Sequence, residues 1–292
     1  MQNFNAHLNF KGQYLQLQHE KIYYYTFGSG PTLLFIHGHR SDALRYQGLL
    51  QSLSDYVSVI APDLPGCGQT PPYQNAPHTM QKYAQTLKEF IEKLELKNLI
   101  LMGGSMGGII CLRLYPLIKN RVSKNILIAT PADSSFFTPA TKKKAALAKF
   151  LAPFLLKTRL IPWLIQKIIN NDFLMRFIQE KTLPEYANNR EVIEFEIKQW
   201  RAMNFTVWLQ SLNDLAKTHL KNLDIQITQP TLIIETKKNQ YYDSDQNLNF
   251  LKKIAPNHQV IFIPWETHVP KGNLSKDLFD QFRNKFENFL KN

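Results

Sequence analysis

Ser105 is the residue of this chain that is best placed to act as a nucleophile. It lies in the glycine-rich segment 103–108 (GGSMGG), between the apolar runs 98–102 and 109–112. A strand, a sharp turn and a helix in this order form a nucleophile elbow, which lifts the serine hydroxyl clear of the sheet. The strained turn requires small residues two positions before and after the serine, and Gly103 and Gly107 meet that requirement. The alternative interpretation is a glycine-rich helix start that binds nothing or cradles a phosphate.

A serine nucleophile needs a base, a group that orients the base, and N–H donors for the developing oxyanion. His268 is the candidate base. It follows the last predicted strand, 259–263, and precedes a C-terminal amphipathic helix, whose apolar positions are Leu278, Phe279, Phe282, Phe286 and Leu290.

The elements that must position these residues alternate between strand and helix patterns. An antiparallel pair is predicted at 14–17 and 21–26. Short apolar runs, typical of strands buried on both faces of a parallel sheet, follow at 32–36, 57–61, 98–102, 124–129, 231–234 and 259–263. Helical spacing covers 42–53, 79–94 and 248–254.

The stretch from 134 to 222 has helical segments and no convincing strand. The pattern predicts an α/β fold with a mostly parallel central sheet flanked by helices and an inserted all-helical lid. We expect residues 1–133 and 223–292 to form the core and residues 134–222 to form the lid.

Four motifs give the chain a resemblance to the α/β-hydrolase superfamily, in its serine esterase and lipase-like branch with a helical lid, over nearly the whole length. They are IHGH at 36–39, DLPGCG at 63–68, GGSMGG at 103–108, and His268. The resemblance implies that Ser105 is the nucleophile and His268 the base. It also implies an oxyanion hole made by the backbone N–H groups of Met106 and His39. It gives His37 and Asp63 structural roles in their loops.

The third member of the catalytic set departs from the family pattern. The resemblance places an Asp shortly after the strand 231–235, where this chain has Asn239. An amide accepts a hydrogen bond from imidazole but brings no charge to an imidazolium. We select Asp133, at the end of the strand that follows the nucleophile strand, as the acid. Asn239 itself and Asp243 are the alternatives, and Glu235 and Asp245 are further carboxylates in this region.

The charge of the chain indicates which kinds of partner it could bind. The 292 residues carry 35 Lys and Arg against 23 Asp and Glu, a formal net charge of +12. No nucleic-acid-binding module is evident, so we expect no nucleic acid partner. Seven basic residues between 141 and 171 interleave with apolar ones. This pattern fits either a weak contact with anionic membrane through the lid or a solvated basic face over an ordinary apolar one.

Cys67 and Cys111 are the only two cysteines, which favours a reducing, cytoplasmic location. The eight histidines contain no H-x-x-x-H pair, so we expect neither a metal nor another cofactor.

The sequence therefore predicts a serine hydrolase of the carboxylic-ester-hydrolase kind. It would act on a fairly apolar, small-molecule ester or related acyl substrate through an acyl-serine intermediate. The expectation of an apolar substrate rests on lid aromatics such as Phe137, Phe150, Trp163, Phe173 and Trp208. The alternative is a catalytically impaired ligand-binding protein, because of Asn239. Ester, thioester and C–C bond hydrolysis, acyl transfer and the oligomeric state all stay open.

Overall fold

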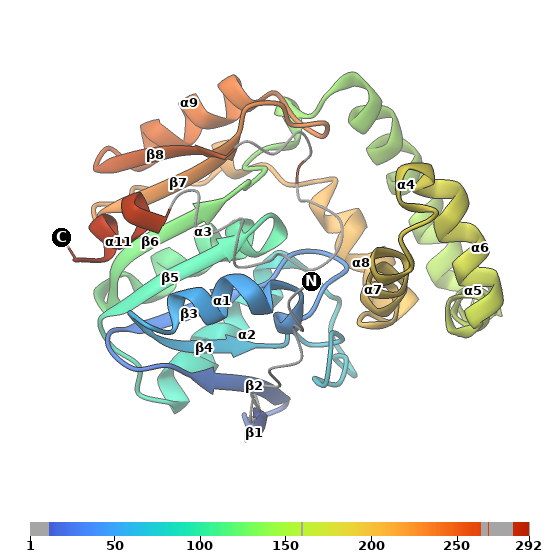
Figure 1. The fold of residues 1–292 in the computed structure, drawn as a ribbon, viewed down its shortest axis with the longest axis horizontal. Helices are drawn as coiled ribbons and strands as arrows, with labels where there is room; N and C mark the ends of the chain where they lie inside the picture. Colours follow the sequence, from blue (N-terminus) through green and yellow to red (C-terminus); the bar gives the residue numbers. More distant parts are fainter. Residues whose placement is uncertain (1–11, 159, 264–267, 269–282, 292) are drawn as a thin grey trace.

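A computed structural model describes residues 12–158, 160–263, 268 and 283–291. Its centre is an eight-stranded sheet in the order β1-β2-β4-β3-β5-β6-β7-β8 (Figure 1). The strands are β1 (Gly12–Gln16), β2 (Lys21–Phe27), β3 (Thr32–Ile36), β4 (Ser58–Pro62), β5 (Leu99–Gly104), β6 (Val122–Ile128), β7 (Thr231–Thr236) and β8 (His258–Ile263). The β1–β2 and β2–β4 pairs are antiparallel, and every later pairing is parallel. The mostly parallel sheet and the antiparallel start confirm the fold predicted from the sequence.

Helices cover both faces of the sheet, so its central strands are buried on both sides. One face packs against α2 (Met80–Lys93), α3 (Met106–Ile118) and α9 (Ser244–Ile254), through residues such as Phe90, Ile110 and Leu251. The other face packs against α1 (Gln47–Leu53) and α11 (Arg283–Lys291), through residues such as Leu50 and Phe286. This arrangement explains why the inner strands read as continuous apolar runs rather than as alternating ones.

The C-terminal helix is described from Arg283 onward. Three of the apolar positions expected for it, Leu278, Phe279 and Phe282, lie outside the described residues.

A block of helices, which we call the lid, is inserted between β6 and β7. It contains α4 (Pro139–Lys157), α5 (Leu160–Asn170), α6 (Asp172–Thr182), α7 (Arg190–Arg201) and α8 (Phe205–Leu215). Short 3₁₀ turns η3 (Ser134–Phe136), η4 (Pro184–Tyr186) and η5 (Leu220–Asn222) lie within or beside it. The lid has its own small core, which includes Ile169, Met175 and Ile197. In Figure 1, α4, α5 and α6 project away from the sheet at one end of the molecule.

The strand order places the candidate site residues at one edge of the sheet. β3, β5, β6, β7 and β8 are parallel neighbours, so their carboxyl ends lie side by side. Ligand sites of open α/β sheets form at this edge. The loops after these strands carry His39, Ser105, Asp133, Asn239 and His268 in that order. None of the helices in the described part of the chain has the length and apolar character that a bilayer crossing requires.

Candidate active site

Ser105 occupies the strained turn between β5 and α3. Its backbone has φ 52° and ψ −118°, a conformation that side-chain-bearing residues rarely adopt. The turn is held by a hydrogen bond from the Ser105 N–H to the Ile128 carbonyl at 2.8 Å. A Cβ at Gly107 would lie 2.0 Å from the Ile36 carbonyl oxygen, and one at Gly103 would lie 2.5 Å from the backbone of Gly107. Both glycines are therefore required by close backbone contact.

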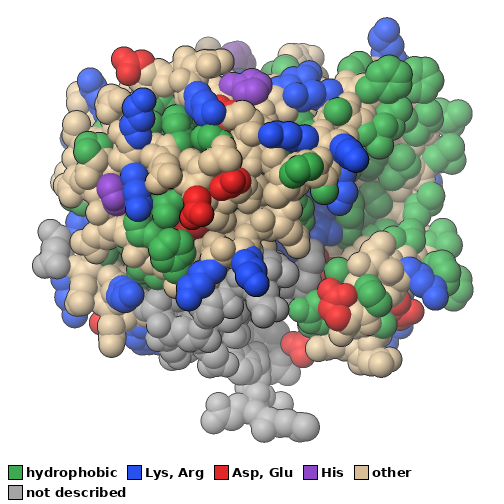
Figure 2. Space-filling view, turned by 90° about the horizontal axis from the view of Figure 1, so that it is seen from above, with side chains coloured by type: hydrophobic (Ala, Val, Ile, Leu, Met, Phe, Trp, Pro, Cys, Tyr) green, Lys and Arg blue, Asp and Glu red, His purple; other side chains and the backbone are tan. Residues whose placement is uncertain are grey.

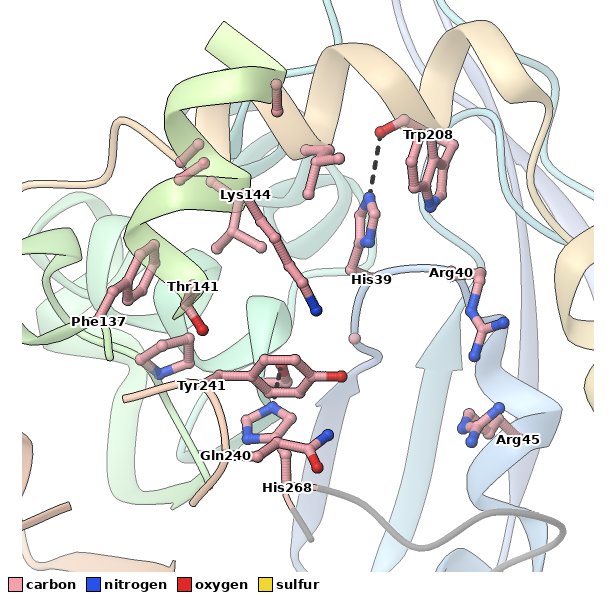
Figure 3. A pocket seen from close by; sticks show the side chains of 18 of the residues that line it. His39, Arg40, Arg45, Phe137, Thr141, Lys144, Trp208, Gln240, Tyr241 and His268 are labelled. Atoms are coloured by element: carbon pink, nitrogen blue, oxygen red, sulfur yellow. Dashed lines mark hydrogen bonds between the residues drawn. The ribbon is translucent and has the colours of Figure 1, made fainter. Parts of the chain in front are cut away.

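His268 meets Ser105 across the top of the sheet. The Nε2 atom of His268 lies 2.8 Å from the Ser105 hydroxyl oxygen, within hydrogen-bond distance. The imidazole is buried, and the rings of Tyr241 and Tyr242 contact it edge to face, at centroid distances of 5.2 and 5.8 Å. Figure 3 shows His268 beneath Tyr241 at the base of the pocket. Sequence reasoning did not single out either tyrosine.

Asn239 lies against the other ring nitrogen of His268. The Nδ2 atom of Asn239 is 2.9 Å from His268 Nδ1. The Asn239 Oδ1 atom accepts a hydrogen bond from the backbone N–H of Tyr241 at 3.0 Å. A backbone N–H only donates, so it fixes which end of the amide faces His268. The amide therefore presents N–H, rather than an oxygen, to the imidazole.

This orientation sets the tautomer of His268. Because Asn239 donates to Nδ1, that nitrogen accepts and the single proton of the neutral imidazole resides on Nε2. The Nε2–H group then donates to the Ser105 hydroxyl oxygen. A group that takes a proton from a serine needs an unprotonated Nε2, which this tautomer does not offer. In a serine protease triad, the same Asp-to-Asn change fixes the wrong tautomer and lowers kcat by about 10⁴.

Asp133, which we selected from the sequence as the orienting acid, has other partners in the structure. Its carboxylate accepts hydrogen bonds from the backbone N–H groups of Ser135 at 2.9 Å and Lys221 at 3.2 Å, and it lies 3.5 Å from His219. Burial opposes ionisation of this group, but the hydrogen bonds outweigh it and hold the pKa of Asp133 below its usual value. Asp133 therefore ties the two ends of the lid together at the edge of the sheet.

The other acid candidates also have structural partners. Asp243 caps α9 by accepting from the Gln246 N–H at 3.0 Å, and this bond lowers the pKa of its exposed carboxyl. Glu235 is fully buried, and it accepts from the Tyr242 hydroxyl at 2.9 Å and from Asn247 Nδ2 at 3.2 Å. Burial raises the pKa of Glu235 in spite of these bonds.

The residues expected to supply the oxyanion hole flank Ser105. Met106 is the first residue of α3, where backbone N–H groups lack partners within the helix. The loop after β3 lies against the elbow, because a Cβ at Gly38 would come within 3.5 Å of Ser105 Cβ. The next residue, His39, turns its side chain toward α8, and its Nε2 lies 3.2 Å from the Trp208 carbonyl (Figure 3). Burial lowers the pKa of His39 to about 4, so its ring is neutral at pH 7.

His37 and Asp63 have the structural roles that the resemblance implied. The Nε2 atom of His37 accepts from the Leu64 N–H at 3.0 Å, which joins the loops after β3 and β4. The Asp63 carboxylate accepts from the backbone N–H groups of Ala43 and Gln69, and burial raises its pKa to about 7.

A pocket of about 460 Å³ opens in front of Ser105 and His268. One wall is apolar and is formed by Phe137, Ala145, Ala148, Trp208, Leu212 and Leu215. Three basic side chains also line the pocket: Arg40 and Arg45 come from the segment after β3, and Lys144 extends from α4, the helix that carries Ala145 and Ala148. Several lid aromatics that led us to expect an apolar substrate do not line this pocket. Phe150, Trp163 and Phe173 are exposed on the outside of the lid instead.

The two arginines of the pocket wall share one lid carboxylate. Arg40 and Arg45 each place an Nη2 atom on Glu196 of α7, at 2.9 and 3.0 Å. Glu196 is fully buried, and Arg45 Nη1 has no hydrogen-bond partner within the described part of the chain. One negative charge thus faces two guanidinium groups. Sequence reasoning missed this cluster, since Glu196 lies about 150 residues from both arginines and no local motif connects them.

Across the described residues, no group of three or more His, Cys, Asp and Glu side chains is arranged to hold a metal ion.

Comparisons with known proteins agree with this architecture. A family model described as the alpha/beta hydrolase fold matches residues 31–154. A cis-3-alkyl-4-alkyloxetan-2-one decarboxylase of Shewanella oneidensis is 28% identical over 138 residues, which are 46% of this chain and 42% of that protein. The chain spans less than half the length of the curated relatives it matches, from 30% to 45%.

Solved structures match over nearly the whole chain. A thermophilic esterase from Thermogutta terrifontis has a TM-score of 0.71 and 20% identity, and the match covers 96% of this chain and 99% of that one. An epoxide hydrolase from Bacillus megaterium, in an M145A mutant form, has a TM-score of 0.72 and 17% identity, and the match covers 96% of this chain and 100% of that one. Together with the sheet order, the elbow and the inserted helices, these matches show that the chain has the α/β-hydrolase fold.

Proposed function

We propose that the protein is a serine hydrolase that cleaves an ester or related acyl bond through an acyl-serine intermediate. The observation that carries this proposal is the 2.8 Å contact between Ser105 Oγ and His268 Nε2, at the base of a pocket of substrate size. The esterase and the epoxide hydrolase that the chain resembles in structure support the hydrolase class alone. A serine at the elbow favours acyl chemistry over the carboxylate-nucleophile branches of the superfamily.

The proposed chemistry follows from the positions of the side chains. The Ser105 oxygen attacks the substrate carbonyl while His268 Nε2 takes its proton, and the N–H groups of Met106 and His39 stabilise the oxyanion. For this step the imidazole proton must move from Nε2 to Nδ1, where the Asn239 N–H opposes it. The imidazolium that then forms has an amide beside it instead of a carboxylate. We therefore expect slow turnover from the native chain.

The pocket walls define the substrate more closely. The apolar wall accommodates a hydrocarbon portion of the acyl group. Arg40, Arg45 and Lys144 also line the pocket and favour an anionic or strongly hydrogen-bond-accepting group near them, because among the described contacts only Glu196 is seen to offset their charge. We propose an acyl substrate that combines both parts. This revises the expectation of a purely apolar substrate.

A second candidate function is a ligand-binding protein that keeps the fold and has lost catalysis. The observation that favours it is the hydrogen bond from the Tyr241 N–H to Asn239 Oδ1, which holds the amide in its unproductive orientation. Cys67 and Cys111 are both free and buried, which supports a reducing, cytoplasmic location for either function.

Labelling with a fluorophosphonate probe tests the nucleophile. We expect one probe per chain on Ser105, no labelling of Ser105→Ala, and strongly slowed labelling of His268→Gln, measured by intact mass spectrometry. The Asn239→Asp variant serves as a positive control with a restored acid. If neither the native chain nor this variant reacts, the ligand-binding function is favoured.

Asn239→Asp tests the orienting group. A carboxylate at this position accepts from Nδ1–H, selects the reactive tautomer and stabilises the imidazolium. We expect hydrolysis of a short p-nitrophenyl ester to rise at least tenfold, with about 10⁴ as the upper bound. Nitrogen-15 NMR should show the His268 proton on Nε2 in the native protein and on Nδ1 in the variant. An Nδ1–H tautomer in the native protein would contradict the amide orientation.

Asp133→Asn separates a structural role from a catalytic one. Loss of the charged acceptor should lower the free energy of unfolding by about 1–3 kcal/mol at pH 7 and leave kcat within about twofold of the native value. The native pKa of Asp133 is below its unfolded value, so its contribution is present above about pH 3.9 and is lost as the pH falls further. The difference in unfolding free energy between the native chain and Asp133→Asn, measured by urea unfolding, should therefore become smaller at acid pH. The control is Asp243→Asn, which removes the exposed carboxylate that caps α9. A large fall in kcat for Asp133→Asn alone would support Asp133 as the acid that orients His268.

Lys144→Gln tests the anionic part of the substrate. Lys144 is exposed on α4 and points into the pocket (Figure 3), so its replacement should not disturb folding. We expect kcat/KM for a p-nitrophenyl monoester of a long-chain diacid to fall roughly threefold to tenfold. The value for the neutral ester of equal length should not change. Lys143→Gln, on the same helix but outside the pocket lining, is the matched control. Equal effects on both esters would contradict recognition of the anionic group by Lys144.

A further inference from the structure

The outer surface of the lid carries most of the large apolar side chains that are exposed in the described structure. Twelve of the 17 lie between residues 147 and 178. They belong to α4, α5 and α6 and are Leu147, Phe150, Leu151, Phe154, Leu160, Trp163, Leu164, Ile168, Phe173, Leu174, Phe177 and Ile178. We call this set the apolar lid face. In Figure 2, hydrophobic side chains gather at the end of the molecule where these helices lie.

The apolar lid face is not the packing face of these helices. Of the 19 residues of α4, only Ala152 is buried. Phe150 and Phe173 are 78% and 79% exposed. The lid core uses other residues, such as Ile169, Met175 and Ile193. A monomeric soluble protein rarely exposes so continuous an apolar area unless that area binds something. The sequence also allowed a solvated basic face over a buried apolar face. The surface differs from that alternative because its apolar side chains are exposed.

Positive charge accompanies the apolar lid face. Residues 139–182 contain nine Lys and Arg against two Asp and Glu. The charges lie among the aromatic rings, since Lys167 Nζ is 5.4 Å from the Trp163 ring centre and Lys181 Nζ is 5.8 Å from that of Phe177. Basic residues beside exposed aromatics are the pattern of helices that lie in the interface of an anionic membrane.

We propose that the apolar lid face docks the protein onto an anionic lipid bilayer. The aromatic and leucine side chains would enter the interface, and the lysines would contact the lipid phosphates. Charge decides between this occupant and a second copy of the chain. Two copies would bring two predominantly basic helical segments against each other, and the two acidic residues of each segment could not offset that charge.

Docking would bring the bilayer close to the candidate active site. Helix α4 carries both surfaces, because Lys144, Ala145 and Ala148 line the pocket while Leu147, Phe150 and Leu151 are exposed. An amphiphilic acyl substrate held in the membrane would thus lie near the pocket. The docking itself does not depend on Ser105 and stands apart from the proposed hydrolase function.

Vesicle sedimentation tests the proposal. We expect the full chain to bind vesicles of phosphatidylcholine mixed with phosphatidylglycerol, to bind phosphatidylcholine alone far more weakly, and to be released by salt. On binding, the fluorescence of Trp163 should shift to the blue, and Trp163→Phe should remove much of that shift. Ser105→Ala should bind as the native chain does, which separates docking from catalysis.

Matched variants identify the surface. Phe150→Gln with Phe173→Gln, and separately Lys149→Gln with Lys167→Gln, should each weaken vesicle binding on the order of tenfold. The controls are the exposed Phe262→Gln on β8 and the pair Lys97→Gln with Lys253→Gln, which should change nothing. Absence of binding to anionic vesicles overturns the proposal. So does a dimer, seen by analytical ultracentrifugation, that is lost in the Phe150 and Phe173 double variant, because the face would then join two copies.

Discussion

The close approach of α3 to the end of β3 is the constraint on which the rest of the site depends. At Gly107 there is no room for even one carbon beside the Ile36 carbonyl, so the start of α3 sits directly on the neighbouring strand. This contact forces the chain between β5 and α3 to turn at Ser105 with a positive φ. The same contact places the first N–H groups of α3 beside the loop after β3. The position of the Ser105 hydroxyl and that of these N–H groups are therefore consequences of a single backbone packing arrangement.

The charged side chains at the candidate active site are mostly positive, which is unusual. Arg40, Arg45 and Lys144 line the pocket, and the carboxylate of Glu196 is held between the two arginines. Asn239 supplies an amide where a negative charge would favour an imidazolium on His268. In the proposed reaction, both features would oppose the transfer of the serine proton to His268. An anionic group on the substrate would make protonation of His268 less unfavourable. Binding of the substrate and transfer of the proton would then be coupled through the electrostatic potential of the pocket.

Local patterns predicted the parts of the molecule that short-range physics determines. The apolar runs located the inner strands, and the glycine spacing located the elbow, since both follow from sterics within a few residues. The partner of His268 was harder to assign. Asp133 has the right position in the strand order, yet backbone donors at Ser135 and Lys221 take its carboxylate.

The lid illustrates a second limit of prediction from the sequence. Its aromatic residues indicated an apolar interior, but helical spacing does not reveal which face of an inserted helix meets the core. Phe137 and Trp208 line the pocket, whereas Phe150 and Phe173 face outward. The Arg40–Glu196–Arg45 cluster joins residues from distant parts of the chain and only folding brings them together.

The amide at Asn239 has one further consequence, which concerns the ageing of the protein. Asparagine side chains are thermally labile, and water hydrolyses the amide to aspartate with release of ammonia. In most places such a lesion is damage, but here it would install the missing carboxylate against His268 Nδ1. A small deamidated fraction would then carry a disproportionate share of any turnover observed in an old or heated sample.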